Sequence, residues 1–501
     1  MLENLMYGLS VALSATNLLY ALLGAVVGTV VGVLPGLGPL GAMALLLPAT
    51  FGLNVTTSMI LFAGIYYGSM YGGSTTSILV RVPGEAASVV TCIEGYEMAK
   101  KGRAGAALAV SAVGSFIAGT VSIIALTVVA VPLAEAALKF GPPEYLAISL
   151  AGLFLLARLT GGDPLKSLIM AVGGLMLGTV GIDSISGNLR FTFGNMALAD
   201  GIDFLPVAMG LFGIAEILSL LLEGDNGPEA VGAVRFRDLW PNLQEWKRSV
   251  GPMLRGSVLG FLVGLIPGPS PVISTMASYE LEKRISRGRN EFGRGAIEGV
   301  AGPEAANNAA VGGAYVPLLA LGLPFTPASA VILAAMIIHG VSPGPLLIKT
   351  RPELFWGVVA SMYIGNLMLL VFNLPLVGIF AAIARLPKRV LIPAVLILSV
   401  VGVYSVNYST FDVILLGIFG VIGFIAKMFN FEVTPMVLGL VLGPIMEGAL
   451  RESLMITHGS IIQLVTRPLS GIILALAALV LVLPAIVRRP RQEVIIAEDG
   501  K

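Results

Sequence analysis

The sequence predicts an all-α polytopic membrane protein built from two inverted repeats, and three observations lead to this prediction. Only 12% of the 501 residues are charged, about half of the roughly 25% that is usual in soluble proteins, whereas 56% are hydrophobic. Apolar stretches long enough to cross a bilayer recur along the whole chain. A motif rich in Gly and Pro near the N-terminus returns in the second half of the chain.

Composition also excludes several classes of function. The 30 Lys and Arg nearly balance the 29 Asp and Glu, and no long basic stripe is present, which argues against a nucleic acid as partner. The chain has one cysteine, Cys92, and two histidines, His339 and His458. A cysteine metal site is therefore excluded, and little is left for histidine chemistry. We expect a protein that is not an enzyme and that contains no cofactor or resident metal.

Eleven apolar stretches have the length of membrane-spanning helices. They lie at about 56–80, 104–131, 143–159, 165–183, 204–223, 298–321, 353–379, 389–407, 411–429, 432–450 and 470–487. Two further apolar regions, 18–51 and 252–281, are interrupted near their middles by Pro and Gly. The stretches 82–98 and 325–347 are too broken or too polar to be read as clean spans.

The distribution of Lys and Arg predicts the topology, because basic loops stay on the cytoplasmic side. The basic loops lie at 100–103, 158–166, 235–248 and 282–294, and the acidic loops at 132–144 and 183–203. Basic loops on both sides of 252–281 require this segment to enter and leave by the same face. We read it as a re-entrant hairpin whose Pro-Gly turn lies within the membrane. If 325–347 also returns to its starting side, the basic residues after 384 fall inside, whereas Lys349 and Arg351 fall outside, a weak violation of the rule.

The duplicated motif divides the chain into two units. The motif residues Gly24, Gly28, Gly32, Pro35, Gly36 and Pro39 recur 232 positions later as Gly256, Gly260, Gly264, Pro267, Gly268 and Pro271. Gly72-Gly73 with Pro83 likewise matches Gly312-Gly313 with Pro324, at an offset of 240–241. We therefore expect a first repeat at 1–223 with hairpin 18–51, a cytoplasmic loop at 224–250, a second repeat at 251–487 with hairpin 252–281, and a cytoplasmic tail at 488–501.

In this topology the hairpin 18–51 opens outward and the hairpin 252–281 opens inward. Inverted repeats with broken helices are usual in secondary transporters, which hold their substrate between the breaks. Broken helices leave N–H groups that attract anions and carbonyl groups that coordinate Na⁺. The candidate binding residues at the two breaks are Gly36, Gly38, Gly268 and Ser270. The regularly spaced glycines, such as Gly24, Gly28 and Gly32, instead favour close helix packing.

Two polar clusters inside apolar surroundings add further candidates, because buried polar groups in membranes are costly unless they have a function or a partner. Ser74, Thr75 and Thr76 follow two glycines, and Asn307 and Asn308 precede two. Their hydroxyl and amide groups suit either a carboxylate ligand or Na⁺. The alternative is that the hydroxyls bond to their own helices. Two carboxylates beside prolines, Glu85 and Glu304, fit a helix-capping role equally well.

Five motifs together resemble the TctA family, the large membrane subunit of tripartite tricarboxylate transporters. They are Gly-Val-Leu-Pro-Gly-Leu-Gly-Pro at 32–39, Tyr-Gly-Gly-Ser-Thr-Thr-Ser-Ile-Leu at 71–79, Pro-Gly-Glu-Ala-Ala-Ser-Val-Val-Thr at 83–91, Pro-Glu-Ala-Ala-Asn-Asn-Ala-Ala at 303–310 and Ile-His-Gly-Val-Ser-Pro-Gly-Pro at 338–345. The resemblance covers essentially the whole chain.

The resemblance implies uptake of citrate or other small carboxylates across the bacterial inner membrane, driven by Na⁺ or H⁺. It also implies two partners, a small TctB-like membrane subunit and a periplasmic TctC-like solute-binding protein. Alternating access by rocking or by sliding both remain open. A passive channel or an exporter on the same scaffold is the alternative. An intramembrane enzyme is a weaker one, because it would need a nucleophile, a metal or an acid–base pair within the membrane.

Overall fold

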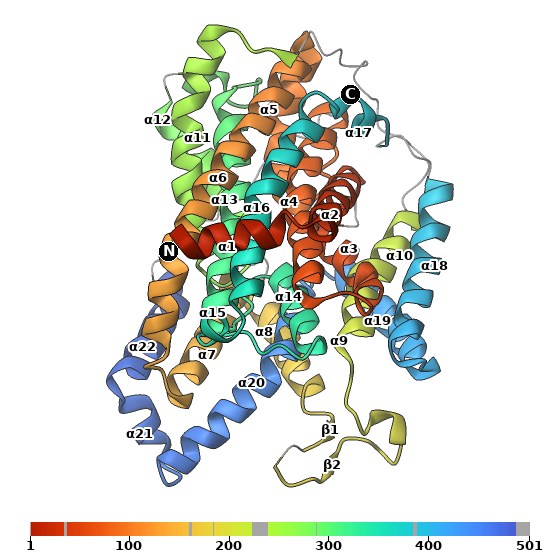
Figure 1. Ribbon diagram of the computed structural model, residues 1–501, viewed down its shortest axis with the longest axis vertical. Helices are drawn as coiled ribbons and strands as arrows, with labels where there is room; N and C mark the ends of the chain where they lie inside the picture. The colour runs from red at the N-terminus through yellow and green to blue at the C-terminus, as the bar shows by residue number, and fades with distance from the viewer. Residues whose placement is uncertain are drawn as a thin grey trace.

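The computed structural model describes residues 2–34, 38–159, 163–183, 185–222, 239–286, 288–383 and 388–486, and these are mostly helical (Figure 1). Within these described ranges, five helical segments are long and apolar enough to span a membrane: Ala15–Val33, Thr91–Ala137, Phe204–Leu222, Pro352–Asn373 and Thr410–Met428. Five shorter apolar helices accompany them. The chain is therefore a multi-pass membrane protein, while the number of eleven spans stays a prediction.

The first unit consists of α2 (Ala15–Val33), α3 (Gly38–Leu46) and α4 (Val55–Val80). Glycines of α2 lie directly against the backbone of α4, since a β-carbon on Gly24 or Gly32 would lie 2.4 or 2.2 Å from the carbonyl oxygen of Leu61 or Ser69. Residue numbers rise together along this contact, so α2 and α4 run in the same direction. The chain between them must return, and α3 is the returning helix.

The second unit has the same arrangement in α11 (Leu243–Gly264), α12 (Ser270–Ile285) and α13 (Glu298–Leu321). A β-carbon on Gly256 or Gly264 would lie 2.3 or 2.4 Å from the carbonyl oxygen of Gly302 or Ala310. Helices α11 and α13 therefore run in the same direction, with α12 between them. The predicted packing role of the motif glycines is confirmed in both units.

The contacts also correct the register of the repeat by one residue. A β-carbon on Gly72 would meet the carbonyl oxygen of Thr29 at 2.3 Å, and one on Gly313 would meet that of Phe261 at 2.5 Å. Gly72 therefore corresponds to Gly313, and the offset along α4 and α13 is 241 throughout. Because each copy has two adjacent glycines, the sequence alone is compatible with an offset of 240 or 241. Only the packing contacts distinguish the two alignments.

The central helices α4 and α13 cross in opposite directions. Ser74, near the end of α4, donates a hydrogen bond to Glu304 near the start of α13, whereas Tyr66 contacts Tyr315 at a ring-centroid distance of 6.3 Å. Every residue from 56 to 79 and from 298 to 321 is buried. Gly, Ser, Thr and Asn are tolerated along both helices because protein surrounds them.

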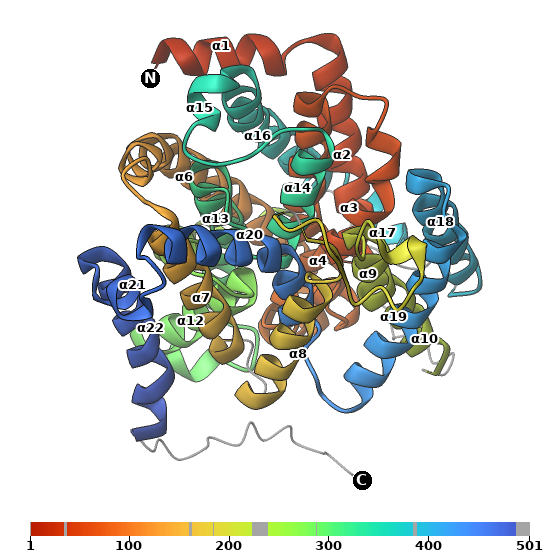
Figure 2. The same cartoon turned by 90° about the horizontal axis from the view of Figure 1, so that it is seen from below.

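The remaining helices surround this centre (Figures 1 and 2). Those closest to it are α1 (Leu2–Ala12), α5 (Thr91–Met98), α6 (Ala104–Ala137), α14 (Pro327–Ile338), α15 (Leu347–Thr350), α16 (Pro352–Asn373) and α17 (Val377–Ile383). One flank contains α7 (Pro142–Leu159), α8 (Pro164–Leu177), α20 (Thr434–Ile456), α21 (Ile461–Thr466) and α22 (Pro468–Ile486). The other flank contains α9 (Phe204–Ala208), α10 (Ala215–Leu222), α18 (Lys388–Asn407) and α19 (Thr410–Met428). The predicted span 353–379 is interrupted where α16 ends at Asn373.

The loops near α5 and α11 lie at one end of the molecule, and the strands β1 and β2 lie at the other (Figure 1). At one end Arg103 pairs with Glu245 and Arg248 with Glu298, which joins three loops that the sequence predicts to be cytoplasmic. At the other end a two-stranded antiparallel sheet, β1 (Gly181–Ile182) and β2 (Leu189–Arg190), was not predicted from the sequence. The tail 488–501 and most of the loop 224–250 lie outside the described residues.

Candidate functional site

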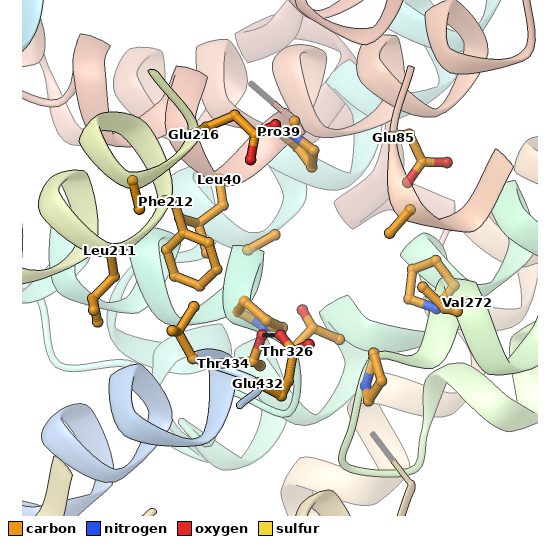
Figure 3. Close-up of a pocket in the computed structure, with 18 of the residues that line it drawn as sticks. Pro39, Leu40, Glu85, Leu211, Phe212, Glu216, Val272, Thr326, Glu432 and Thr434 are labelled. Atoms are coloured by element: carbon orange, nitrogen blue, oxygen red, sulfur yellow. Dashed lines mark hydrogen bonds between the residues drawn. The ribbon is translucent and has the colours of Figure 1, made fainter. Parts of the chain in front are cut away.

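A cavity of about 670 Å³ lies where the broken helices of both units meet (Figure 3). The first unit contributes Gly38, Pro39, Leu40 and residues 82–86; the second contributes Pro269, Pro271, Val272 and residues 326–328. Figure 3 shows Glu85 and Val272 on one wall, with Leu211 and Phe212 across the cavity. The cavity is thus built from four chain breaks that lie far apart in the sequence.

Four α-helices begin at the cavity wall: α3 at Gly38, α12 at Ser270, α14 at Pro327 and α20 at Thr434. The prolines of the motif stop α2 and α11 shortly before the cavity, and new helices start within it. The N–H groups at a helix start have no partner within the helix and carry a partial positive charge. An arrangement of this kind favours an anion in the space between the helix starts.

The structure fixes this geometry through one backbone contact. Gly268, just before α12, has a φ of +143° that disfavours any side chain, and its N–H donates to the carbonyl oxygen of Phe325 at 2.9 Å. Phe325 precedes α14. The start of α12 and the start of α14 are therefore held together as one wall of the cavity.

Two matching capping boxes stand on the cavity wall, one in each unit. The carboxylate of Glu85 accepts from the backbone N–H of Ala87 at 2.9 Å and caps the 3₁₀ helix η2 (Ala86–Val89). Thr326 accepts from the N–H of Ser329 at 3.1 Å and caps α14. Glu85 and Thr326 are 241 positions apart, as the repeat requires. The capping role predicted for Glu85 is confirmed.

Four charged side chains line the cavity, and their partners differ. Lys427 and Glu216 form an ion pair at 2.8 Å, and Glu432 accepts a hydrogen bond from Thr434 at 2.8 Å. Glu85 is buried and, within the part of the chain that the structure describes, contacts no basic side chain. Among the described residues neither Glu85 nor Glu432 has a basic partner, and of these two carboxylates Glu85 is buried whereas Glu432 is exposed.

Of the predicted binding residues, Gly38 and Asn307 are those that reach the cavity or its first layer. Gly38 lines it, with a φ of +57°. Asn307 is fully buried and donates its side-chain N–H to Glu85 at 3.2 Å, while its amide oxygen has no partner among the described residues. The contact between Tyr66 and Thr326, at 3.4 Å, lies at the corresponding place in the repeat.

The predicted cluster at 74–76 lies behind the cavity wall. The hydroxyl of Ser74 donates to the carboxylate of Glu304, and Thr76 donates to the carbonyl oxygen of Gly73 at 3.2 Å. Thr75 is buried beside them. Thr76 therefore makes the bond within its own helix that the sequence left as an alternative. Ser74 has a partner of this kind as well, the carbonyl oxygen of Met70 at 3.4 Å, and also connects the two central helices through Glu304.

The other predicted residues are spread around the breaks. Asn308 donates to the hydroxyl of Ser115 at 2.7 Å, away from the cavity lining. Ser270 stands between two prolines that line the cavity, and its buried hydroxyl has no partner among the described residues. Gly268 shapes the wall without lining it, and Gly36 lies outside the described residues. The binding role of each of these residues stays a prediction.

Sequence reasoning did not select the two carboxylates that matter most in the structure. Glu304 is inside α13 and caps no helix; it is completely buried and accepts hydrogen bonds from Ser74 and Thr91. Glu85 faces the cavity. A signal was available, because the repeat aligns Pro83-Gly84-Glu85 with Pro324-Phe325-Thr326, and a charged residue opposite a neutral one marks a position where duplicated units have diverged.

Comparison with known protein families shows to which family the chain belongs. The sequence model of the Tripartite tricarboxylate transporter TctA family matches residues 18–438. The chain belongs to the TctA family. Both central helices, all four breaks and the cavity lie within the matched residues. As a TctA-family chain it is a membrane component of a tripartite transporter, a system that works with other subunits.

Two similar proteins come from Agrobacterium vitis. One, named "Uncharacterized 52.8 kDa protein in TAR-I ttuC' 3'region", is 46% identical over 501 residues, covering 100% of this chain and 99% of the relative. The other, "Uncharacterized protein in TAR-II ttuC' 3'region", is 42% identical over 242 residues, which are 48% of this chain and 100% of the relative. No solved structure matches this TctA-family chain.

Proposed function

We propose that this chain is the large transmembrane subunit of a tripartite secondary transporter that imports citrate-like tricarboxylates or other small carboxylates. A TctC-like periplasmic binding protein delivers the substrate, and a TctB-like small membrane subunit completes the complex in the bacterial inner membrane. A gradient of Na⁺ or H⁺ drives the uptake. The TctA family membership supports the transporter class.

The observation that carries the proposal is the meeting of four helix starts at one cavity of about 670 Å³. Carboxylate groups of a substrate accept hydrogen bonds from the free N–H groups of α3 and α12, and the helix dipoles add to the attraction. The cavity lies in the volume range of small-molecule sites. Gly38 and Asn307 are the predicted binding residues closest to such a ligand.

The transmembrane arrangement is part of the same proposal. The helix pairs α2/α3 and α11/α12 are the two re-entrant hairpins, and the opposite directions of α4 and α13 support two inverted repeats. Re-entrant backbone is tolerated only where protein or a water-filled cavity surrounds it, and both breaks lie beside the cavity. Eleven further spans complete the predicted topology.

Uptake of labelled citrate and a panel of dicarboxylates tests the proposal, in cells that express this chain with its two partner subunits. We expect accumulation that requires both the ion gradient and the binding protein. Uptake that only equilibrates would identify a passive channel, and efflux against a gradient would identify an exporter. Driven uptake that persists without the binding protein would contradict the tripartite mechanism.

A further inference from the structure

Two oxygen atoms from different helices lie together at Gly84, the residue that precedes Glu85. Gly84 stands where α2 ends, and a β-carbon on Gly84 would lie 1.9 Å from the carbonyl oxygen of Gly32 and 2.8 Å from the hydroxyl oxygen of Thr76. These two oxygens therefore lie within 3 Å of one point, next in the chain to Glu85. Only a glycine leaves this point open.

The carbonyl of Gly32 belongs to the last turn of α2, which ends at Val33. Carbonyl groups in the last turn of a helix have no partner within the helix and carry partial negative charge. In broken membrane helices such carbonyls coordinate Na⁺. The end of α2 thus offers one oxygen ligand and an electrostatic field that favours a cation.

Glu85 and Asn307 supply the other two oxygens. Each carboxylate oxygen of Glu85 accepts one N–H, from Ala87 at 2.9 Å and from Asn307 at 3.2 Å, so each retains capacity for a further contact. The amide oxygen of Asn307 belongs to the same amide group that touches Glu85. It is completely buried and has no partner among the described residues, so it is free to coordinate a cation.

An ionised Glu85 would repel a carboxylate substrate, and a bound cation would cancel this repulsion. Glu85 lines the cavity in which the helix starts favour an anion, and a second buried carboxylate, Glu304, lies behind it on α13. A bound carboxylate substrate would face an uncompensated negative charge in surroundings of low dielectric constant, where repulsion is strong. A cation bound at Glu85 cancels that repulsion.

We propose that Na⁺ binds between the end of α2 and Glu85, with the carboxylate of Glu85, the amide oxygen of Asn307, the hydroxyl of Thr76 and the carbonyl of Gly32 as ligands. Carboxylate, amide, hydroxyl and carbonyl oxygens are the donors that hard cations take, and a single carboxylate suits a monovalent ion. Identifying this ion as the coupling ion rests on the proposed function, whereas the site itself does not. Binding of Na⁺ then favours substrate binding, and the reverse holds equally.

Thermal unfolding of the purified full-length chain tests the site without a substrate. We expect NaCl, compared with KCl at equal ionic strength and pH, to raise the melting temperature in a saturable manner. Glu85→Gln should abolish this Na⁺-dependent rise, and Thr76→Val should shift its midpoint to higher Na⁺. Glu216→Gln is the matched control, because it removes a carboxylate of the same cavity whose charge Lys427 already balances.

The outcomes separate the site from the transport function. A wild-type chain without a Na⁺-dependent rise, or a Glu85→Gln variant with an unchanged rise, overturns the proposal. If Glu85→Gln does not fold, the Thr76→Val midpoint decides: an unshifted midpoint overturns the site. A Na⁺-dependent rise lost in Glu85→Gln, together with no uptake of any carboxylate, would sustain the site and refute the proposed substrate class. Carboxylate uptake driven by H⁺, together with no Na⁺-dependent rise in the melting temperature, would refute the site and sustain the proposed substrate class.

Discussion

The two breaks that follow the central helices share a scaffold and differ in chemistry. Both carry a capping residue with a serine three positions later, and both cappers touch the opposite central helix, Glu85 through Asn307 and Thr326 through Tyr66. The first break has a carboxylate where the second has a hydroxyl. Duplication thus supplied two equivalent walls, and only one of them retains a charge.

The residues around the cappers differ in the same direction. At the positions that correspond to Gly84 and Thr76, the second unit has Phe325 and Pro317. Phenylalanine has a side chain where glycine has none, and proline offers no hydroxyl. The comparison teaches that the helix starts, which attract anions, come from both units, whereas three of the four ligands of the proposed cation site, Gly32, Thr76 and Glu85, come from the first.

The largest effect on transport is expected when Glu85 at the first break is replaced by threonine, the residue at the corresponding position of the second break. In Glu85→Thr we expect the gradient-driven accumulation of substrate to be lost, since the charge that binds the coupling cation is removed. Threonine also caps helices, so the free energy of unfolding should change by only about 1 kcal/mol. Uptake and thermal unfolding of the same preparation measure both effects. Wild-type accumulation in this variant would remove the functional distinction between the breaks.

The contacts made by the two cappers give the next largest contrast. Asn307→Ala should abolish uptake while expression and membrane insertion stay normal, because the amide contributes a ligand and a contact to Glu85. Tyr66→Phe removes only a neutral hydrogen bond of 3.4 Å, worth about 1 kcal/mol at most, and should lower the uptake rate less than about tenfold. Equal losses in the two variants would show that the walls contribute alike.

Helix packing should show no asymmetry between the units. Gly72→Ala and Gly313→Ala each place a methyl group against a carbonyl oxygen, at 2.3 and 2.5 Å before any relaxation. Each should lower the free energy of unfolding by about 1–3 kcal/mol. Gly365→Ala on α16 is the control, since its added methyl group meets no atom within 4 Å. Very different losses at the two sites would contradict the one-residue correction of the register.

The smallest effect is expected away from the helices α2–α4 and α11–α13. The hydrogen bond from Arg451 holds the pKa of Asp183 well below its ordinary value, so its ionised form stabilises the fold above the unfolded pKa of about 3.9, and this contribution is lost as the pH falls below it. Asp183→Asn should melt slightly below the wild type at pH 7, and the difference should narrow in acid. Carboxylate uptake should be unchanged at neutral pH. A reduced uptake rate would give the β1–β2 region a part in transport.

The sequence was informative where local chemistry decides the structure. Prolines in the duplicated motif end α2 at Val33 and α11 at Gly264, and the basic loops meet through pairs such as Arg103 with Glu245. The polar groups inside the bundle could not be assigned in the same way. Ser74 reads equally as a ligand or as a residue bonded to its own helix, and its partner Glu304 is 230 positions away. Only the crossing of α4 and α13 decides between these interpretations.

The contacts of Glu304 also imply an order in which the parts of the protein assemble during synthesis. Its two hydroxyl partners, Ser74 and Thr91, belong to the first unit and leave the ribosome more than 200 residues before Glu304 does. An isolated carboxylate enters a bilayer only at a high cost. The first unit is therefore the acceptor for the second during membrane insertion, and a chain truncated after 222 should persist better than a fragment that begins at 239.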